Sequence, residues 1–258
     1  MKKEAIQAAR LAGEVLKNHF QSLSKNDVER KSKHEIVTVV DKEAEKVILK
    51  YLQEKFPEHN YISEESEPSF NESELTWIID PLDGTLNYTM NNPVFCTSIG
   101  LAKGNEMVLG VVHNPLSGDY YVAEKGQGAY LNDKKIAVSG EINLKNSVVG
   151  YCHGREDADM LWSAEMYKML KPKVMDIRRF GSAALELAYT ASGKLESFYI
   201  NHVNSWDVAA GVLLVQEAGG MVTDFSGKPW NIRSNDMLAS NGLVHDENLK
   251  LIQTNNVK

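Results

Sequence analysis

One short stretch constrains the fold of this chain more than any other: Trp77-Ile78-Ile79-Asp80-Pro81-Leu82-Asp83-Gly84-Thr85. Its apolar residues predict a buried strand, and the Pro and Gly that follow predict a tight turn where that strand ends. Asp80 and Asp83 stand three residues apart across the turn, so their carboxylates can converge. Two carboxylates held that close repel each other unless a cation lies between them.

The chemistry of this turn allows two interpretations. Carboxylate oxygens favour Mg²⁺, Mn²⁺ or Ca²⁺ over zinc, and backbone N–H groups at a helix start, here at Gly84 and Thr85, readily bind a phosphate. These features indicate metal-assisted phosphate chemistry. The same residue types are also ordinary turn formers, and Asp83 could simply cap a helix.

Hydrophobic periodicity in the first half predicts helices packed on a sheet. Apolar residues at helical spacing predict helices over about 3–23 and 44–56, and Thr38 with Asp41 resembles a capping box at the entry to the second helix. From about 75 to 139, strand-like segments alternate with turns. They predict a mostly antiparallel sheet flanked by the two helices.

The second half alternates between strands and helices. Strands are expected at 147–151, 174–178, 196–200, 221–224 and 237–239, and helices at 157–170, 183–192, 208–218 and from 246 onward. This alternation predicts an α/β arrangement with a mixed sheet. We therefore expect an α+β N-terminal half, residues 1–143, and an α/β C-terminal half, residues 144–258, with a cleft between them.

Composition limits the partners and the compartment. The formal net charge of −7 argues against a general nucleic-acid binder, and bound divalent cations would be needed to offset it near an anionic substrate. Cys96 and Cys152 are too few for a zinc cluster or a disulfide framework, and buried, inert thiols are expected. Without a signal core or a membrane-length apolar stretch, the sequence predicts a soluble cytoplasmic protein.

Further acids stand where strands end or helices begin. Glu64 and Glu65 follow a short apolar step, Asp41 occupies the capping-box position, and Asp207 opens an apolar helix. Taken singly, each is most simply a surface or helix-capping carboxylate. Glu64, Asp207 and the two acids of the turn all lie where α/β folds place their sites, which favours one shared metal site.

In their order along the chain, these motifs resemble those of the inositol monophosphatase family. This superfamily of lithium-sensitive, Mg²⁺-dependent phosphatases includes fructose-1,6-bisphosphatases and 3′(2′),5′-bisphosphate nucleotidases. The resemblance covers nearly the whole chain and rests on four segments: Glu64-Glu65, Asp80-Pro81-Leu82-Asp83-Gly84-Thr85, Arg179-Phe180-Gly181-Ser182-Ala183-Ala184 and Trp206-Asp207-Val208-Ala209-Ala210-Gly211. It implies a layered αβαβα sandwich and a homodimer.

The resemblance also implies a set of metal ligands. Glu64, Asp80 and the backbone carbonyl of Leu82 would bind a first Mg²⁺. Asp80, Asp83 and Asp207 would bind a second, and a weaker third Mg²⁺ would share Glu64. Two ions suit the chemistry, because one can acidify the attacking water while the other stabilises the leaving alkoxide.

Roles in proton transfer and substrate binding follow from the same resemblance. Thr85 and Asp41 correspond to the pair that positions and deprotonates the attacking water. The N–H groups of Gly84 and Thr85 would hold the phosphate, beside Asp83 and Asp207. The alcohol half of the substrate would lie against Gly181, Ser182 and Ala183.

Substrate identity is the least determined expectation. Inositol-specific members carry a glutamate seven residues before the second-motif aspartate, where this chain has Ile200, which cannot accept a hydroxyl hydrogen bond. Asn201 or Asn204 could substitute if the strand were offset. Inositol 1-phosphate is the expected substrate, with fructose 1,6-bisphosphate and adenosine 3′,5′-bisphosphate as alternatives. An alternative of another class is a regulatory binding protein that retains the fold.

Overall fold

The computed structural model describes residues 1–254, in which a seven-stranded sheet has the order β3-β4-β5-β6-β7-β8-β9. Its strands are β3 (Asn60–Ser63), β4 (Leu75–Asp83), β5 (Cys96–Lys103), β6 (Glu106–Asn114), β7 (Asp119–Glu124), β8 (Gly128–Leu131) and β9 (Lys134–Ile136). Only β3 and β4 pair in parallel in this sheet of the described chain. The predicted mostly antiparallel sheet is confirmed, although β8 and β9 were not foreseen.

A five-stranded sheet has the order β11-β10-β12-β14-β13. Its strands are β10 (Val148–His153), β11 (Asp176–Arg178), β12 (Ser197–Asn201), β13 (Met221–Thr223) and β14 (Asp236–Ser240). β10 is parallel to β11 and β12, whereas β14 is antiparallel to β12 and β13. The mixed sheet predicted for the second half is therefore confirmed.

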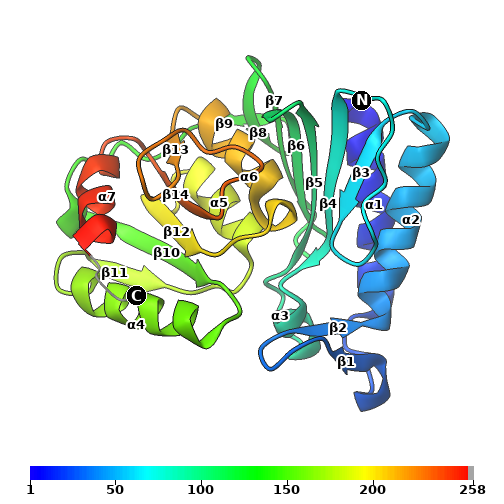
Figure 1. Cartoon of the computed structure of the whole chain (residues 1–258), viewed down its shortest axis with the longest axis horizontal. Helices are drawn as coiled ribbons and strands as arrows, with labels where there is room; N and C mark the ends of the chain where they lie inside the picture. The colour runs from blue at the N-terminus through cyan, green and yellow to red at the C-terminus, as the bar shows by residue number, and fades with distance from the viewer. Residues whose placement is uncertain (255–258) are drawn as a thin grey trace.

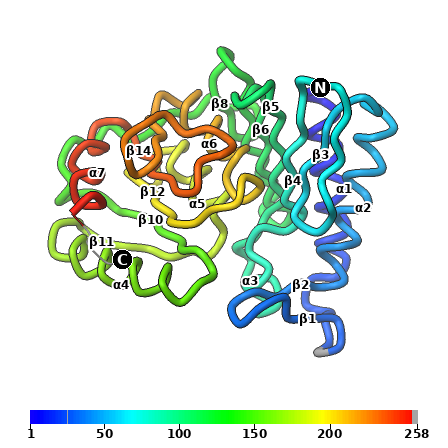
Figure 2. The backbone as a smooth tube through the Cα atoms, in the orientation of Figure 1, coloured from blue at the N-terminus to red at the C-terminus, as the bar shows by residue number. Residues whose placement is uncertain are grey.

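Helices complete five layers in the order αβαβα (Figure 1). From one side of the molecule to the other they are α1 (Lys2–His19) with α2 (Val39–Lys55), then α5 (Ala183–Ala191) with α6 (Ser205–Glu217) between the sheets, and α4 (Asp157–Leu170) with α7 (His245–Thr254). The tube in Figure 2 shows the chain completing the first sheet before it enters the second. The predicted layered sandwich is confirmed.

Two short segments lie near the opening between the sheets. The hairpin of β1 (Val28–Arg30) and β2 (Ile36–Thr38) precedes α2, and the short helix α3 (Thr85–Thr89) follows β4. The hairpin was not predicted because its strands have only three residues each, too few to show a clear period. The first helix ends at His19 rather than near 23, since Phe20 is extended and Gln21 has a φ of 67°.

Close packing of α6 on the first sheet fixes the position of that helix. A Cβ atom on Gly110 of β6 would lie 2.5 Å from the carbonyl oxygen of Ala210 in α6, so only glycine allows this approach. Buried residues of α6 and of both sheets share one hydrophobic cluster. Within residues 1–254, no helix is long and apolar enough to cross a membrane.

Candidate active site

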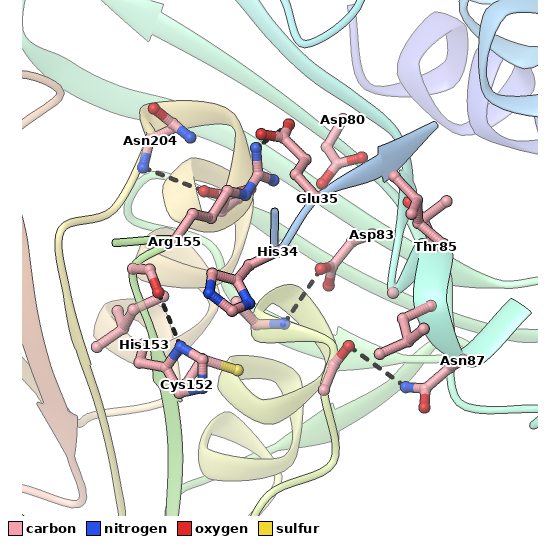
Figure 3. A pocket seen from close by; sticks show the side chains of 18 of the residues that line it. His34, Glu35, Asp80, Asp83, Thr85, Asn87, Cys152, His153, Arg155 and Asn204 are labelled. Atoms are coloured by element: carbon pink, nitrogen blue, oxygen red, sulfur yellow. Dashed lines mark hydrogen bonds and ion pairs between the residues drawn. The ribbon is translucent and has the colours of Figure 1, made fainter. Parts of the chain in front are cut away.

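A cavity of about 380 Å³ opens between the two halves of the chain. Its lining brings together Glu64, Asp80, Asp83 and Asp207, which are separated by up to 143 positions in the sequence. Figure 3 shows Asp80, Asp83 and Thr85 on one wall, with Arg155, His153 and Asn204 opposite. The predicted candidate residues that line it are Glu64, Asp80, Leu82, Asp83, Gly84, Thr85, Gly181, Ala183, Ile200 and Asp207.

The end of β4 delivers the two carboxylates through a bulge, not the tight turn that was predicted. Pairing with β5 shifts register between Asp80 and Asp83, and the strand continues to Asp83. The Leu82 N–H donates to Asp80 Oδ1 at 3.0 Å, which closes the bulge. The chain then bends at Gly84, whose φ of +93° lies in the left-handed region that favours glycine.

Asp83 connects the two halves of the chain. It accepts hydrogen bonds from Ser182 Oγ at 2.5 Å, from the Ala183 N–H at 3.2 Å and from the Ala184 N–H at 2.8 Å, at the start of α5. Ser182 is fully buried, so it lies behind the cavity instead of lining it as expected. Its hydroxyl orients Asp83.

Capping interactions place two more acids at helix starts. The Thr38 side chain accepts from the Asp41 N–H and Asp41 Oδ2 accepts from the Thr38 N–H at 2.9 Å, which confirms the predicted capping box of α2. In α6, Asp207 Oδ2 accepts from the Asn204 N–H at 3.1 Å in the same way. Asp207 faces the cavity because the packing of α6 on β6 fixes where this helix begins.

Thr85 stands between Asp41 and the cavity. Its Oγ1 lies 3.1 Å from Asp41 Oδ1 and 3.1 Å from the Leu82 carbonyl oxygen, so its single proton can go to either acceptor. Asp41 is buried, and burial raises its pKa to about 6. A half-buried hydroxyl backed by such a carboxylate can pass a proton away from the cavity.

The cavity acids raise one another's pKa values. Burial and then repulsion from Glu64, Asp83 and Asp207 raise the pKa of Asp80 well above its ordinary value. Burial followed by Glu64 raises the pKa of Asp207 to about 7, and burial raises that of Asp83 to about 6. A divalent cation with oxygen ligands would offset this repulsion, so the donor set fits Mg²⁺.

Two basic side chains contact Glu64 and Glu65. Lys31 Nζ lies 2.6 Å from Glu65 Oε1 and 3.4 Å from Glu64 Oε1, and Arg155 lies 3.3 Å from Glu64 Oε1. In residues 1–254, no group of three or more His, Cys, Asp or Glu side chains stands positioned to hold a metal ion. The cavity acids thus suit Mg²⁺ by their chemistry without standing in a closed ligand cluster in the described chain, and Glu64 Oε1 contacts Lys31 and Arg155 instead.

The β1–β2 hairpin is attached across the cavity by charge. Lys33 Nζ lies 2.8 Å and His34 Nε2 3.0 Å from Asp157 Oδ1 at the start of α4, and Arg155 pairs with Glu35. Figure 3 shows Glu35 beside Arg155 in the cavity. Sequence reasoning missed these residues, because ion pairs between positions more than 100 apart leave no local spacing signal.

The cavity lining also includes Ile200 and Cys152, which pair across β12 and β10. Asn201 points elsewhere: its amide contacts Ser163 Oγ and the carbonyl oxygen of Asp159, at 3.2 and 3.3 Å. The one-residue offset that would have let Asn201 replace the expected glutamate is therefore wrong. Arg179 also lines the cavity, and it has no ion pair or side-chain hydrogen bond within the described chain.

A buried glutamate supports the loop of Phe180 and Gly181, which lines the cavity. Glu186 Oε1 accepts from the N–H groups of Phe180 at 3.0 Å and Gly181 at 3.1 Å, and from Cys152 Sγ at 3.4 Å. No residue of 1–254 hydrogen-bonds its Oε2. Burial raises the pKa of Glu186 to about 8, so this carboxyl is neutral at pH 7.

We expect the Glu186→Gln variant to keep its stability at alkaline pH better than the wild type. Because the folded-state pKa is raised above the ordinary 4.5, wild-type stability falls as pH rises from about 4.5 to about 8, by up to about 5 kcal/mol. The carboxamide keeps the acceptor for the two N–H groups and cannot ionise. Urea unfolding at about pH 5.5 and about pH 8.5 measures how much the free energy of unfolding changes between the two pH values in each protein. Equal pH dependence in Glu186→Gln, the wild type and the exposed control Glu72→Gln would contradict it.

Comparison with known proteins places this fold and site in one family. A model described as "Inositol monophosphatase family" matches residues 1–256. A Thermotoga maritima protein named "Fructose-1,6-bisphosphatase/inositol-1-monophosphatase" is 37% identical over 249 residues, 96% of this chain and 94% of that protein. The "Nus factor SuhB" of Xylella fastidiosa is 40% identical over 223 residues, 86% of this chain and 81% of that protein.

Solved structures agree with the sequence comparison. The structure of extragenic suppressor protein suhB from Bartonella henselae has a TM-score of 0.92 and 33% identity, and the match covers 98% of each chain. The family match spans both halves, including every segment on which the sequence resemblance rests. This chain belongs to the inositol monophosphatase family of phosphatases.

Proposed function

We propose that this protein hydrolyses a small phosphate monoester with Mg²⁺ at the cavity between its halves. One observation carries the proposal: Glu64, Asp80, Asp83 and Asp207 line a single cavity beside Thr85, which contacts the buried Asp41. Membership of a phosphatase family supports the reaction class.

The proposed metal ligands are those expected from the family. Glu64, Asp80 and the Leu82 carbonyl would hold one Mg²⁺, and Asp80, Asp83 and Asp207 a second, with a weaker third ion on Glu64. When bound, the ions acidify the attacking water and stabilise the leaving alkoxide. Li⁺ is expected to inhibit by occupying a position in the same set.

Proton transfer is assigned to residues of the chain itself. Thr85 Oγ1 accepts a hydrogen bond from the attacking water and donates its own proton to Asp41 Oδ1, 3.1 Å away. A pKa of about 6 keeps Asp41 ionised near neutral pH and still able to take the proton. The Gly84 and Thr85 N–H groups are proposed to hold the phosphate.

Inositol 1-phosphate remains the proposed substrate, and one observation favours a second candidate. Ile200 offers no acceptor to a ring hydroxyl, whereas Arg179 and His153 line the same cavity. An arginine with no ion pair in the described chain suits a second phosphate group. A bisphosphorylated sugar is therefore the second candidate, in line with the name of the Thermotoga relative.

The Ile200→Glu variant tests whether position 200 takes part in recognising the alcohol. Ile200 is 5% exposed and lines the cavity, so a carboxylate there can accept a hydrogen bond from a ring hydroxyl, worth about 1.5–3 kcal/mol. We expect kcat/KM for inositol 1-phosphate to rise about ten- to a hundredfold relative to a bisphosphate. Unchanged relative values in a stable variant would show that position 200 does not contact the alcohol.

A panel of phosphate monoesters ranked by kcat/KM tests the proposed function directly. Inositol 1-phosphate, fructose 1,6-bisphosphate, adenosine 3′,5′-bisphosphate and a generic aryl phosphate cover the candidates. Hydrolysis of none of them with Mg²⁺ would favour the alternative class, a regulatory binding protein. The relative named as a Nus factor gives that alternative its support.

A further inference from the structure

Glu45 of α2 is a buried carboxyl group to which the proposed chemistry gives no role. It stands one helical turn after Asp41, so the two acids lie on one face of the helix. Their exposed fractions are only 3% for Glu45 and 1% for Asp41. The helix packs against β4, with β3 beside it (Figure 1). Glu45 therefore points toward the part of the sheet from which the cavity acids come.

Every hydrogen bond that the Glu45 side chain makes in residues 1–254 comes from the segment 63–66. Its Oε2 accepts from Ser63 Oγ and from the Glu65 N–H at 2.9 Å, and its Oε1 accepts from Ser66 Oγ. These donors flank Glu64 on both sides. Burying a carboxyl group is unfavourable unless its oxygens are hydrogen-bonded, and here one short segment supplies all the donors.

Strand pairing fixes the chain only as far as Glu64. Strand β3 ends at Ser63, which pairs with Ile79 of β4, and the Glu64 N–H still donates to the Ile79 carbonyl at 3.2 Å. Asp80 follows Ile79, so the parallel strand ends bring Glu64 and Asp80 to the same edge of the sheet. Beyond this point the chain leaves the sheet, and the contacts with Glu45 hold it instead.

We propose that Glu45 is a positioning residue for the metal site. It holds the segment 63–66 so that the Glu64 carboxylate stays in the cavity beside Asp80. Because Asp41 lies on the same helix face, α2 positions both the proton acceptor and the segment that carries a metal ligand. The inference rests on the proposed function, in which Glu64 is a Mg²⁺ ligand. Removing a group that orients a metal ligand typically weakens metal binding about 10- to 100-fold.

Calorimetric titration of Mg²⁺ into metal-free protein, without substrate, tests this role. In Glu45→Ala the three donors lose their acceptor, so we expect Mg²⁺ to bind about 10- to 100-fold more weakly than to the wild type. Glu45→Gln keeps one acceptor oxygen, and the Ser66 hydroxyl can accept from the new amide, so its affinity should stay close to that of the wild type. If only the charge of Glu45 mattered, both variants would lose affinity equally.

Two further variants separate positioning from a general loss of stability. Ile48→Ala removes a fully buried side chain farther along α2. It should lower the melting temperature at least as much as Glu45→Ala and still bind Mg²⁺ like the wild type. In a Glu64→Gln background, adding Glu45→Ala should weaken Mg²⁺ binding no further, because Glu45 acts through Glu64.

Hydrogen exchange without metal tests the contact itself. Glu45 Oε2 accepts from the Glu65 N–H, so peptides spanning residues 60–66 should exchange faster in Glu45→Ala than in Glu45→Gln or Ile48→Ala. Ser66→Ala removes one donor from an exposed residue and leaves the buried carboxyl group in place. It should change Mg²⁺ affinity and exchange in the same direction as Glu45→Ala but less, and it tests the proposal even where Glu45→Ala does not fold.

The outcomes distinguish this inference from the proposed function. Saturable Mg²⁺ binding by the wild type, with unchanged affinity in Glu45→Ala and Ser66→Ala, would overturn the role of Glu45 and leave the metal site standing. Equal losses of affinity in Glu45→Ala and Ile48→Ala would overturn it too. Failure of the wild type to bind Mg²⁺ saturably would instead overturn the proposed metal site, and with it any role of Glu45 in metal binding.

Discussion

The Asp80→Asn variant should lose turnover and, without metal, be more stable than the wild type. The carboxamide oxygen can still accept the Leu82 N–H, so the bulge at the end of β4 is kept. Removing one charge relieves the repulsion from Glu64, Asp83 and Asp207 that raises the pKa of Asp80. The same change removes a carboxylate that is proposed to help hold both Mg²⁺ ions. We expect kcat to fall on the order of a thousandfold, about 4 kcal/mol of transition-state stabilisation.

The pH dependence gives this prediction a second readout. Because the folded-state pKa of Asp80 is raised, the wild type loses stability as pH rises above the ordinary aspartate value of 3.8. The stability advantage of Asp80→Asn should therefore be present at neutral pH and vanish in acid. Calorimetry in EDTA measures it, with the exposed Asp133→Asn as a control of equal charge. A melting temperature below wild type at neutral pH would contradict the repulsion argument.

Asp41→Asn should remove proton transfer while leaving metal binding intact. An amide at this position cannot take a proton from Thr85, whose hydroxyl would turn to the Leu82 carbonyl, also 3.1 Å away. We expect kcat to fall by roughly 10²–10⁴ and the acidic limb of the pH–rate profile, near pH 6, to disappear. The shift in melting temperature with Mg²⁺ should match that of the wild type.

Variants of Thr85 test whether Thr85 and Asp41 act as one unit in proton transfer. Thr85→Ala should lose about as much activity as Asp41→Asn, and Thr85→Ser should retain most of it because the hydroxyl remains. The double variant Asp41→Asn with Thr85→Ala should be no slower than either single variant, since groups in one relay are not additive. Fully additive losses would separate Thr85 from Asp41.

Local patterns in the sequence predicted most of the helices and strands. The helix at 157–170 was predicted with the bounds it has in the structure, and the capping box of Thr38 and Asp41 forms as expected. These features depend on residues within four positions of one another, so a sequence shows them directly. The family motifs then predicted that distant acids share a site, and the cavity contains them.

The surroundings of the site depend on contacts that sequence spacing does not encode. Lys31 and Arg155 contact Glu64 from two different halves of the chain. Ser182 donates to Asp83, together with the N–H groups of Ala183 and Ala184 at the start of α5. The bulge after Asp80 was mistaken for a tight turn, since Pro and Gly occur in both. The ion pairs of Glu64, the contact of Ser182 with Asp83 and the bulge all depend on tertiary packing.

Phosphate release during titration of Mg²⁺ into EDTA-treated protein tests the central claim most directly. The claim is that the carboxylates of both halves form one metal-dependent phosphatase site. We predict no turnover of a phosphate monoester without metal and saturable turnover with Mg²⁺, strongly reduced in Asp207→Ala. Turnover at the same rate in EDTA, or an Asp207→Ala variant with the Mg²⁺ dependence of the wild type, would contradict it.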